Sequence, residues 1–262
     1  MRFTSAGSQV RALYRPPMTE PAIIFETADF LVLNKPAGLS VHGDGFSTEK
    51  TLADWLLDKY PDLKEVGEPM MSQKGVLILK PGLVHRLDRD TSGVLLVAKN
   101  QVTFLFFKQQ FQTQQVQKTY RAILFGELKI DPLKLWQTID IPIGRSSSDP
   151  RRRVANLKAV GALREAVTDY RVLKSNPDFT YIEAKPKTGR THQLRVHFKA
   201  INHPIVGDKL YAPKLIGPET IKRQALHALN LTLKLPSGES ASFESLLPND
   251  FNQTLDSLGL AC

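Results

Sequence analysis

Cysteine and long apolar runs are both scarce in this sequence. Cys262 is the only cysteine among the 262 residues and stands last, so the chain holds neither an internal disulfide nor a cysteine-based zinc site. No apolar stretch approaches the ~20 residues that a membrane-spanning helix requires. These shortages fit a protein of the reducing cytoplasm, which is the location that we expect.

Acidic residues are also in short supply. Lys and Arg outnumber Asp and Glu by 35 to 26, which gives a net charge of +9 and a pI near 9.6. A basic balance of this size points to a polyanionic partner, with nucleic acid first and a membrane surface second. The hydrophobic content of 42% suffices for a substantial core, and the length suits one large domain or two small ones.

The first 20 residues differ in composition from the remainder. They carry Arg2, Arg11 and Arg15 but no apolar segment, so they do not form a secretory signal. We expect a basic, loosely ordered tail over residues 1–20, with Met18 as an alternative start, and a folded domain over residues 21–262.

Hydrophobic periodicity predicts both strands and helices in this domain. Residues 22–35 and 226–243 each have two short β-type runs separated by a turn, which predicts two hairpins. Amphipathic helices are predicted over residues 50–60 and 100–115, and single strands over residues 117–126, 166–173 and 179–184.

Residues 83–97 form the stretch around which the chain is organised. Apolar residues on both sides of Asp88 place it at the end of a core strand, where a rigid scaffold fixes the carboxylate and leaves it open to a substrate. Arg86 and Arg89 flank it, and a nearby cation favours the ionised form that a nucleophile or base needs. From spacing alone, however, such an arginine-rich turn is more often a solvated loop with weak surface ion pairs.

Two later stretches also carry chemically useful side chains. The alternation of residues 117–126 sends Lys118 and Tyr120 to one face of a strand and Arg121 to the other, although a tyrosine in a strand is usually half-buried packing. In residues 187–197, Thr191 can start a helix.

Three histidines in and after this last stretch raise the question of a metal. His192, His197 and His203 lack the i, i+4 spacing of helical zinc ligands, and no acid is placed with them. No metal is therefore expected.

Three strings closely resemble the motifs of the RluA-type pseudouridine synthases: residues 85–93, the Lys-x-Tyr-x-Ala string of residues 118–122, and residues 187–197. The resemblance implies that Asp88 is catalytic and that Tyr120 contacts the reacting base. It also implies that Arg195 pairs with Asp88, which suits the bidentate geometry of a guanidinium.

A further string, residues 34–39, resembles the first conserved stretch of these synthases, near their active cleft. It gives Lys35 a contact with substrate phosphate as the alternative to a solvated surface lysine. The resemblance extends from about residue 22 to about residue 250. It implies an α+β fold with a mixed, largely antiparallel central sheet flanked by helices.

The function implied is the isomerisation of uridine to pseudouridine in structured RNA, with rRNA as the first target and tRNA as the second. The N1–C1′ bond breaks and C5 joins C1′, without cofactor or metal. Whether Asp88 attacks C1′ or takes a sugar proton stays open. The target must leave its stack, and Arg86 is the candidate for filling the gap.

Many large-subunit rRNA members of the family carry an N-terminal S4 RNA-binding domain, and the 20 residues before the resemblance cannot hold one. We therefore expect the catalytic domain or partners to select the RNA. We also expect a monomer.

The strongest local positive charge is the run Arg151, Arg152 and Arg153 in the breaker-rich stretch 138–160. A solvated loop and a contact with RNA phosphates are both compatible with it. The other cations that we expect to bind RNA are Lys118, Arg121, Lys187 and Arg190.

Two other functions compete with the synthase. A metal-dependent RNA hydrolase would use Asp88 and Asp90, but two-metal chemistry needs further carboxylates, and the other motifs supply Arg, Lys and Tyr. A non-catalytic RNA-binding module is the third alternative, against which the intact Asp88, Tyr120 and Arg195 argue.

Overall fold

The computed structural model describes residues 20–43, 48–72, 74–149, 151–155 and 159–261. The tail predicted over residues 1–20, Met18 included, lies outside the described residues except for Glu20. Its separation from one catalytic domain therefore stays a prediction. Within the described ranges, no helix is both long enough and apolar enough to span a bilayer.

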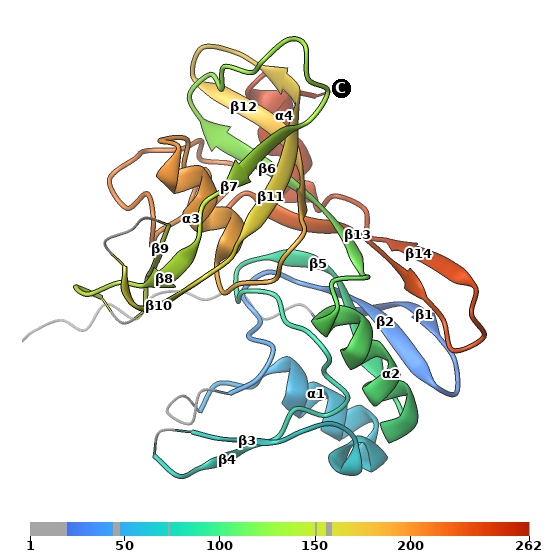
Figure 1. Cartoon of the computed structure of the whole chain (residues 1–262). Coiled ribbons are helices and arrows are strands. Elements are labelled where there is room, and N and C mark those ends of the chain that lie inside the picture. Colours follow the sequence, from blue (N-terminus) through green and yellow to red (C-terminus); the bar gives the residue numbers. More distant parts are fainter. Residues whose placement is uncertain (1–19, 44–47, 73, 150, 156–158, 262) are drawn as a thin grey trace, which may run out of the picture.

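One mixed sheet of nine strands runs through the molecule (Figure 1). Its order is β1-β2-β5-β13-β6-β12-β11-β7, and β14 pairs with β13. The strands are β1 (Ala22–Glu26), β2 (Phe30–Lys35), β5 (Ser92–Ala98), β6 (Gln117–Phe125), β7 (Gln137–Asp140), β11 (Val167–Ser175), β12 (Phe179–Pro186), β13 (Leu226–Lys234) and β14 (Ser240–Glu244). Neighbouring strands in the described sheet are antiparallel except β5 and β13, so the predicted mixed, largely antiparallel sheet is confirmed.

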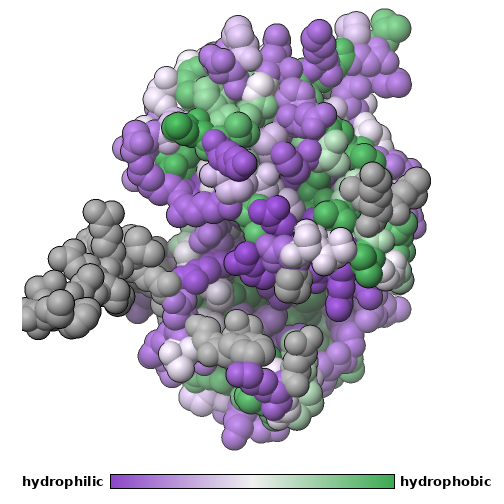
Figure 2. All heavy atoms as spheres, turned by 90° about the vertical axis from the view of Figure 1, so that its left-hand side faces the viewer, coloured by the Kyte–Doolittle hydropathy of each residue, from purple (hydrophilic) through white to green (hydrophobic). Residues whose placement is uncertain are grey.

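Two smaller sheets lie toward one side of the molecule (Figure 1). A hairpin consists of β3 (Met70–Met71) and β4 (Leu77–Ile78). A three-stranded sheet consists of β8 (Ile143–Arg145), β9 (Arg153–Val154) and β10 (Val160–Arg164). Hydrophilic side chains gather across the middle of the face on this side (Figure 2).

The parallel pair β5·β13 is where the two halves of the main sheet join. The register places Ser92 beside His227 and Gly93 beside Ala228. Gly93 has φ +117°, and a Cβ there would lie 2.1 Å from the carbonyl oxygen of Ala228, so only glycine permits this approach. The chain that carries Asp88 enters the sheet at this junction.

The first half of the sheet has a helix on each face. On one face α1 (Leu52–Lys59), which starts with a capping box between Thr51 and Asp54, buries Leu52 and Leu56 against Leu33. A 3₁₀ turn (Pro61–Glu65) follows α1. On the other face α2 (Gln101–Gln112) packs its phenylalanines against β2. The core packing predicted for the Phe stripe of this helix is confirmed.

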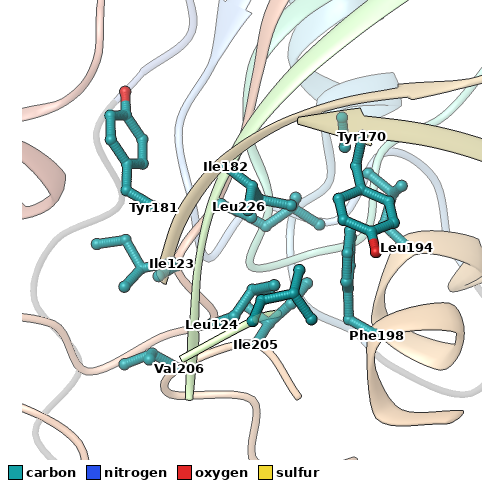
Figure 3. Close-up of a cluster of buried hydrophobic side chains, with 14 of the residues drawn as sticks. Ile123, Leu124, Tyr170, Tyr181, Ile182, Leu194, Phe198, Ile205, Val206 and Leu226 are labelled. Carbon is teal, nitrogen blue, oxygen red and sulfur yellow. The ribbon is translucent and has the colours of Figure 1, made fainter. Parts of the chain in front are cut away.

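The second half is also covered on both faces. Phe198 of α3 (Gln193–Ala200) packs edge-on against Tyr170, and Phe251 of α4 (Asn249–Ser257) packs against Tyr181. Figure 3 shows these layers, with Ile123 beside Tyr181 and Phe198 beside Tyr170. Both faces of this half of the sheet are therefore covered by helices.

Two local predictions were wrong. Residues 138–160, whose breakers favoured a solvated loop, contain the end of β7 and the strands β8 and β9, because pairing with β11 and β10 satisfies the backbone despite the nearby breakers. The third motif helix begins at Gln193 rather than Thr191. Its N-cap is His192, whose left-handed backbone (φ 56°, ψ 21°) turns the chain into the helix.

Candidate active site

A cavity of about 300 Å³ lies where the chain before β5, the start of β6 and the segment before α3 meet. All three motifs of the sequence therefore converge, although Asp88 of the first and Arg195 of the third are 107 positions apart in the chain. The polar side chains in its lining include Arg86, Asp88, Lys118, Tyr120, Lys187, Arg190, His192 and Arg195.

Arg195 holds the carboxylate of Asp88 at the cavity. Its Nη1 donates to Oδ2 of Asp88 at 2.8 Å, whereas Nε and Nη2 donate to Asp208 at 2.7 and 2.9 Å. The bidentate partner of Arg195 is thus Asp208 instead of Asp88. Burial alone would lower the pKa of Arg195, but the two carboxylates raise it, so the guanidinium stays charged.

Asp208 is a site residue that sequence reasoning missed. It is 1% exposed, and its Oδ1 also accepts the backbone N–H groups of Leu210 and Tyr211, each at 3.0 Å. These bonds fix both the position of Arg195 and the turn that follows Asp208. The only signal in the sequence was that Asp208 lies within the range, about residues 22 to 250, over which the family resemblance extends.

Tyr120 extends from β6 into the cavity lining. Burial and the charge of Asp88 raise its pKa, so the phenol stays protonated. Its hydroxyl makes no hydrogen bond to another described residue. The ring is therefore available to a base, and its hydroxyl to a polar group of that base.

His192 lines the cavity beside Asp88, and the ring of Tyr211 packs edge-on against it. The Tyr211 hydroxyl accepts the backbone N–H of Arg153 at 2.9 Å and lies 3.0 Å from Nδ1 of His192. On the other side of the imidazole, Nε2 lies 3.8 Å from Oδ1 of Asp88. Burial lowers the pKa of His192, so the ring is neutral at pH 7.

The Asp88 loop, residues 85–91, is held from behind by Lys35. This side chain is fully buried at the end of β2. Burial lowers its pKa to about 7. Its ammonium donates, at 2.8 to 2.9 Å, to the carbonyl oxygens of Pro36, Leu39 and Arg89. This placement corrects both expectations for Lys35, a solvated surface lysine and a phosphate contact, because the three carbonyl oxygens bind the ammonium and solvent does not reach it.

Further buried polar groups fix the end of the same loop. Arg223 makes a bidentate pair with Asp250 at 2.7 and 2.9 Å and also donates to the carbonyl oxygen of Asp90. His227 lies 2.9 Å from Oγ of Ser92 through Nδ1 and 3.0 Å from the carbonyl oxygen of Ser245 through Nε2. These residues lie beyond the three motifs and gave no signal in the sequence.

His85, at the start of the Asp88 loop, is a neutral packing residue. Its Nε2 accepts the backbone N–H of Leu96 at 2.9 Å, and its ring stacks on Phe111 with centroids 4.6 Å apart. Burial lowers the pKa of His85 to about 3. The ring therefore anchors the loop to β5 and α2.

The cations that we expected to bind RNA near the cavity divide into two groups. Lys118 donates to the carbonyl oxygen of Thr188 at 3.1 Å, and burial, with the charge of Arg190, lowers its pKa to about 8. Arg190, Lys187 and Arg86 share the lining with it. Arg121 is different, because strand alternation directs it to the opposite face, where it forms an ion pair with Glu183. This corrects its expected place in the cleft.

The arginine run has three different environments. Arg151 is exposed and pairs with Asp149 at 2.9 Å, while Nε of Arg152 lies 3.6 Å from the same carboxylate. Arg153 belongs to β9 and supplies the backbone N–H to Tyr211. Arg151 is thus the only exposed residue of the three, whereas Arg152 and Arg153 are partly buried.

The side chains around Asp88 do not fit the alternative function of a two-metal RNA hydrolase. Arg195 lies against Asp88, and no group of three or more His, Cys, Asp or Glu side chains able to hold a metal occurs among the described residues. Two-metal chemistry requires several carboxylates around the ions.

The sequence and the fold were compared with known proteins. Residues 29–200 match the family model described as RNA pseudouridylate synthase. The chain is 35% identical to the ribosomal large subunit pseudouridine synthase D of Neisseria meningitidis serogroup A, over 97% of this chain and 68% of that protein. Its identity to the synthase D of Borreliella burgdorferi is also 35%, over 96% and 72%.

A solved structure agrees with these matches. Human RNA pseudouridylate synthase domain containing 4 superposes with a TM-score of 0.68 at 28% identity, over 91% of this chain and 93% of that chain. Because the family model covers well over half of the chain and the relatives exceed 30% identity, the chain belongs to the RNA pseudouridylate synthase family and is a pseudouridine synthase.

Proposed function

We propose that this enzyme isomerises uridines of large-subunit ribosomal RNA and that Asp88 is the catalytic carboxylate. The observation that carries the proposal is the asymmetry of this carboxylate. Its Oδ2 is bound by Arg195 at 2.8 Å, whereas its Oδ1 accepts no hydrogen bond from a described residue, and Asp88 lines the cavity. One oxygen is thus held and the other is available to a substrate.

The reaction needs a carboxylate next to the sugar. The N1–C1′ bond of the uridine breaks, the base turns within the cavity, C5 joins C1′, and the hydrogen of C5 leaves while N1 gains one, so the product is an isomer. Carboxylates serve glycosidases at the same carbon. Attack on C1′ and removal of a sugar proton both start from ionised Asp88, and Arg195 supplies the compensating charge.

Tyr120 and Arg86 have complementary roles in this proposal. The Tyr120 ring contacts the uracil from the sheet side of the cavity. The exposed Arg86, whose Nη1 lies 3.2 Å from Nε2 of His42, occupies the place of the flipped nucleotide in the stack. Both roles follow from a target that must leave the RNA stack before it reaches Asp88.

RNA binding is assigned to the cations around the cavity. Lys118, Lys187 and Arg190 line one wall, and Arg151 projects from the β8–β9 connection with its side chain 78% exposed. A surface with this charge attracts phosphates of any sequence and leaves the choice of uridine to the cavity and the RNA shape. We also propose that the enzyme acts as a monomer.

The RNA target is supported by the names of the relatives, which are ribosomal large subunit synthases. Pseudouridine maps of rRNA and tRNA from cells with and without the gene test it. We expect one or more sites to disappear from large-subunit rRNA and to return when the gene is restored, but not when it encodes Asp88→Asn. Loss of tRNA sites alone, with an intact rRNA map, would contradict the proposed target.

A further inference from the structure

We propose that His192 is a substrate-binding residue whose Nε2–H donates a hydrogen bond to the 2′-oxygen of the target ribose. This inference rests on the proposed role of Asp88. It adds a contact that would make the site selective for ribose over deoxyribose, because the 2′-hydroxyl is what distinguishes RNA from DNA.

The position of Nε2 relative to Asp88 is the first argument. Nε2 lies 3.8 Å from Oδ1, the carboxylate oxygen that Arg195 leaves free. That separation is too long for a direct hydrogen bond, so Nε2–H and Oδ1 both keep their capacity for a substrate. If Oδ1 acts at C1′ or at its neighbour, a donor 3.8 Å from Oδ1 is close enough to reach the hydroxyl on C2′.

The tautomer of the ring is the second argument. The Tyr211 hydroxyl accepts the backbone N–H of Arg153 at 2.9 Å, so its own proton is free for Nδ1 of His192 at 3.0 Å. A ring that accepts at Nδ1 and is neutral carries its proton on Nε2. The proton therefore faces the cavity.

The backbone of His192 is the third argument. It adopts φ 56° and ψ 21°, a left-handed conformation that residues other than glycine rarely hold and that often marks functional sites. The residue precedes α3 directly, so this conformation directs the chain into the helix that carries Arg195. The third motif thus places two side chains at Asp88.

Two other histidines show what a purely structural ring looks like here. His197 lies 3.0 Å from Thr168 Oγ1 through Nδ1 and 3.0 Å from the carbonyl oxygen of Ile141 through Nε2, and His227 is also held at both nitrogens. In His192 only Nδ1 has a hydrogen-bond partner within the described chain. Its Nε2 is left for the cavity.

A double-substitution experiment tests the contact. His192→Asn tolerates the left-handed backbone but is too short to place a donor at the position of Nε2, whereas His192→Gln reaches it. Each enzyme is assayed on a stem-loop RNA that contains one mapped target uridine, with ribose or 2′-deoxyribose at that position. The value of kcat/KM is measured for every combination.

We expect the 2′-deoxy substitution to lower kcat/KM about tenfold more in the wild type than in His192→Asn, the value of one hydrogen bond. His192→Gln should retain part of this difference. His203→Gln is the control, because His203 bonds the carbonyl oxygen of Phe125 away from the cavity, and it should respond as the wild type does. Equal 2′-deoxy effects in the wild type and His192→Asn would overturn the inference. Failure of the wild type on the ribose stem-loop would count against the proposed function instead.

A second measurement leaves His192 intact. In Asp88→Asn, which should bind RNA without converting it, the ¹⁵N signal of His192 Nε2 is followed on adding the ribose or the 2′-deoxy stem-loop. We expect a shift with the ribose form that the deoxy form does not produce. The same shift with both RNAs would show that Nε2 does not bind the 2′-oxygen.

Discussion

The two sides of the Asp88 loop use the same residue types for opposite purposes. Behind the loop, Lys35 and His227 are buried, and their polar atoms are bonded to other parts of the protein. In front of it, Lys118 and His192 line the cavity with one protein hydrogen bond each. The rear side chains hold a backbone in place, and the front ones keep donors for a ligand.

This difference shows that residue type and motif membership do not define a role. Lys35 belongs to a family string and is structural, because three carbonyl groups surround its ammonium. Asp208 was given no role in advance, yet it determines where Arg195 can present Nη1 to Asp88. What distinguishes the two sides is the number of hydrogen-bond partners that the fold provides.

The largest effect is expected at Arg195, because this residue contacts both the buried Asp208 and the cavity-lining Asp88. Arg195→Ala leaves Asp208 buried without its charge partner and Asp88 without its donor. We expect kcat to fall by at least about 100-fold and the free energy of unfolding to fall by about 3 kcal/mol or more. Single-turnover kinetics and urea unfolding measure the two losses. An active, stable Arg195→Ala enzyme would count against the pair.

Substitutions of Lys35 and Lys118 should test the difference between the rear and the front of the Asp88 loop directly. Lys35→Met removes the donor from three carbonyl groups and should lower the free energy of unfolding by about 1–3 kcal/mol. Lys118→Met, its matched control, should change stability by less than about 1 kcal/mol but weaken RNA binding. Urea unfolding and RNA titrations compare the pair. If Lys118→Met costs as much stability as Lys35→Met, the distinction fails.

The pH dependence of RNA binding tests whether Lys118 contacts an RNA phosphate. Its pKa is lowered to about 8 in the free protein, so the cation that meets a phosphate is present below pH 8 and is lost as the pH rises through that value. Affinity should therefore decline between pH 7 and pH 9. Lys118→Arg stays charged and should show a flatter profile over the same range. Parallel profiles for the two proteins would show that Lys118 meets no phosphate.

The smallest effect is expected at the arginine run, whose three residues are not among those that line the cavity. Replacing Arg151, Arg152 and Arg153 by alanine should flatten the slope of log K against log salt by up to ~2, at ~0.7 per single-strand phosphate contact. Affinity should fall similarly across RNA sequences, while turnover on saturating RNA persists. An unchanged salt slope would mean that the run is only solvated.

Sequence reasoning predicted the fold class and the strings that form the site. Alternation and helical periodicity depend on neighbouring residues, so the two hairpins and the Phe stripe of α2 followed from the sequence. The structure brings Asp88, Tyr120 and Arg195 together at one cavity, and the roles that the family resemblance implied for them stay predictions.

The rest depends on contacts between distant segments. Nothing local distinguishes the buried Lys35 from a surface lysine, since its burial comes from the packing of β2 under the Asp88 loop. Arg121 was expected to bind RNA because nothing local shows that Glu183, on a different strand, pairs with it. His192 was considered only as a metal ligand, because its neighbours Tyr211 and Asp88 meet it only in the folded chain.

The most direct test of the account concerns Asp88 itself. Asparagine keeps the size of the side chain and loses its charge, so Asp88→Asn should retain the cavity and the RNA affinity. With enzyme in excess over an isolated target RNA, a single turnover should yield only a trace of the wild-type pseudouridine, while binding stays within about threefold, or roughly 0.7 kcal/mol. Pseudouridine formation by Asp88→Asn at more than that trace would contradict the central claim that this carboxylate carries out the reaction.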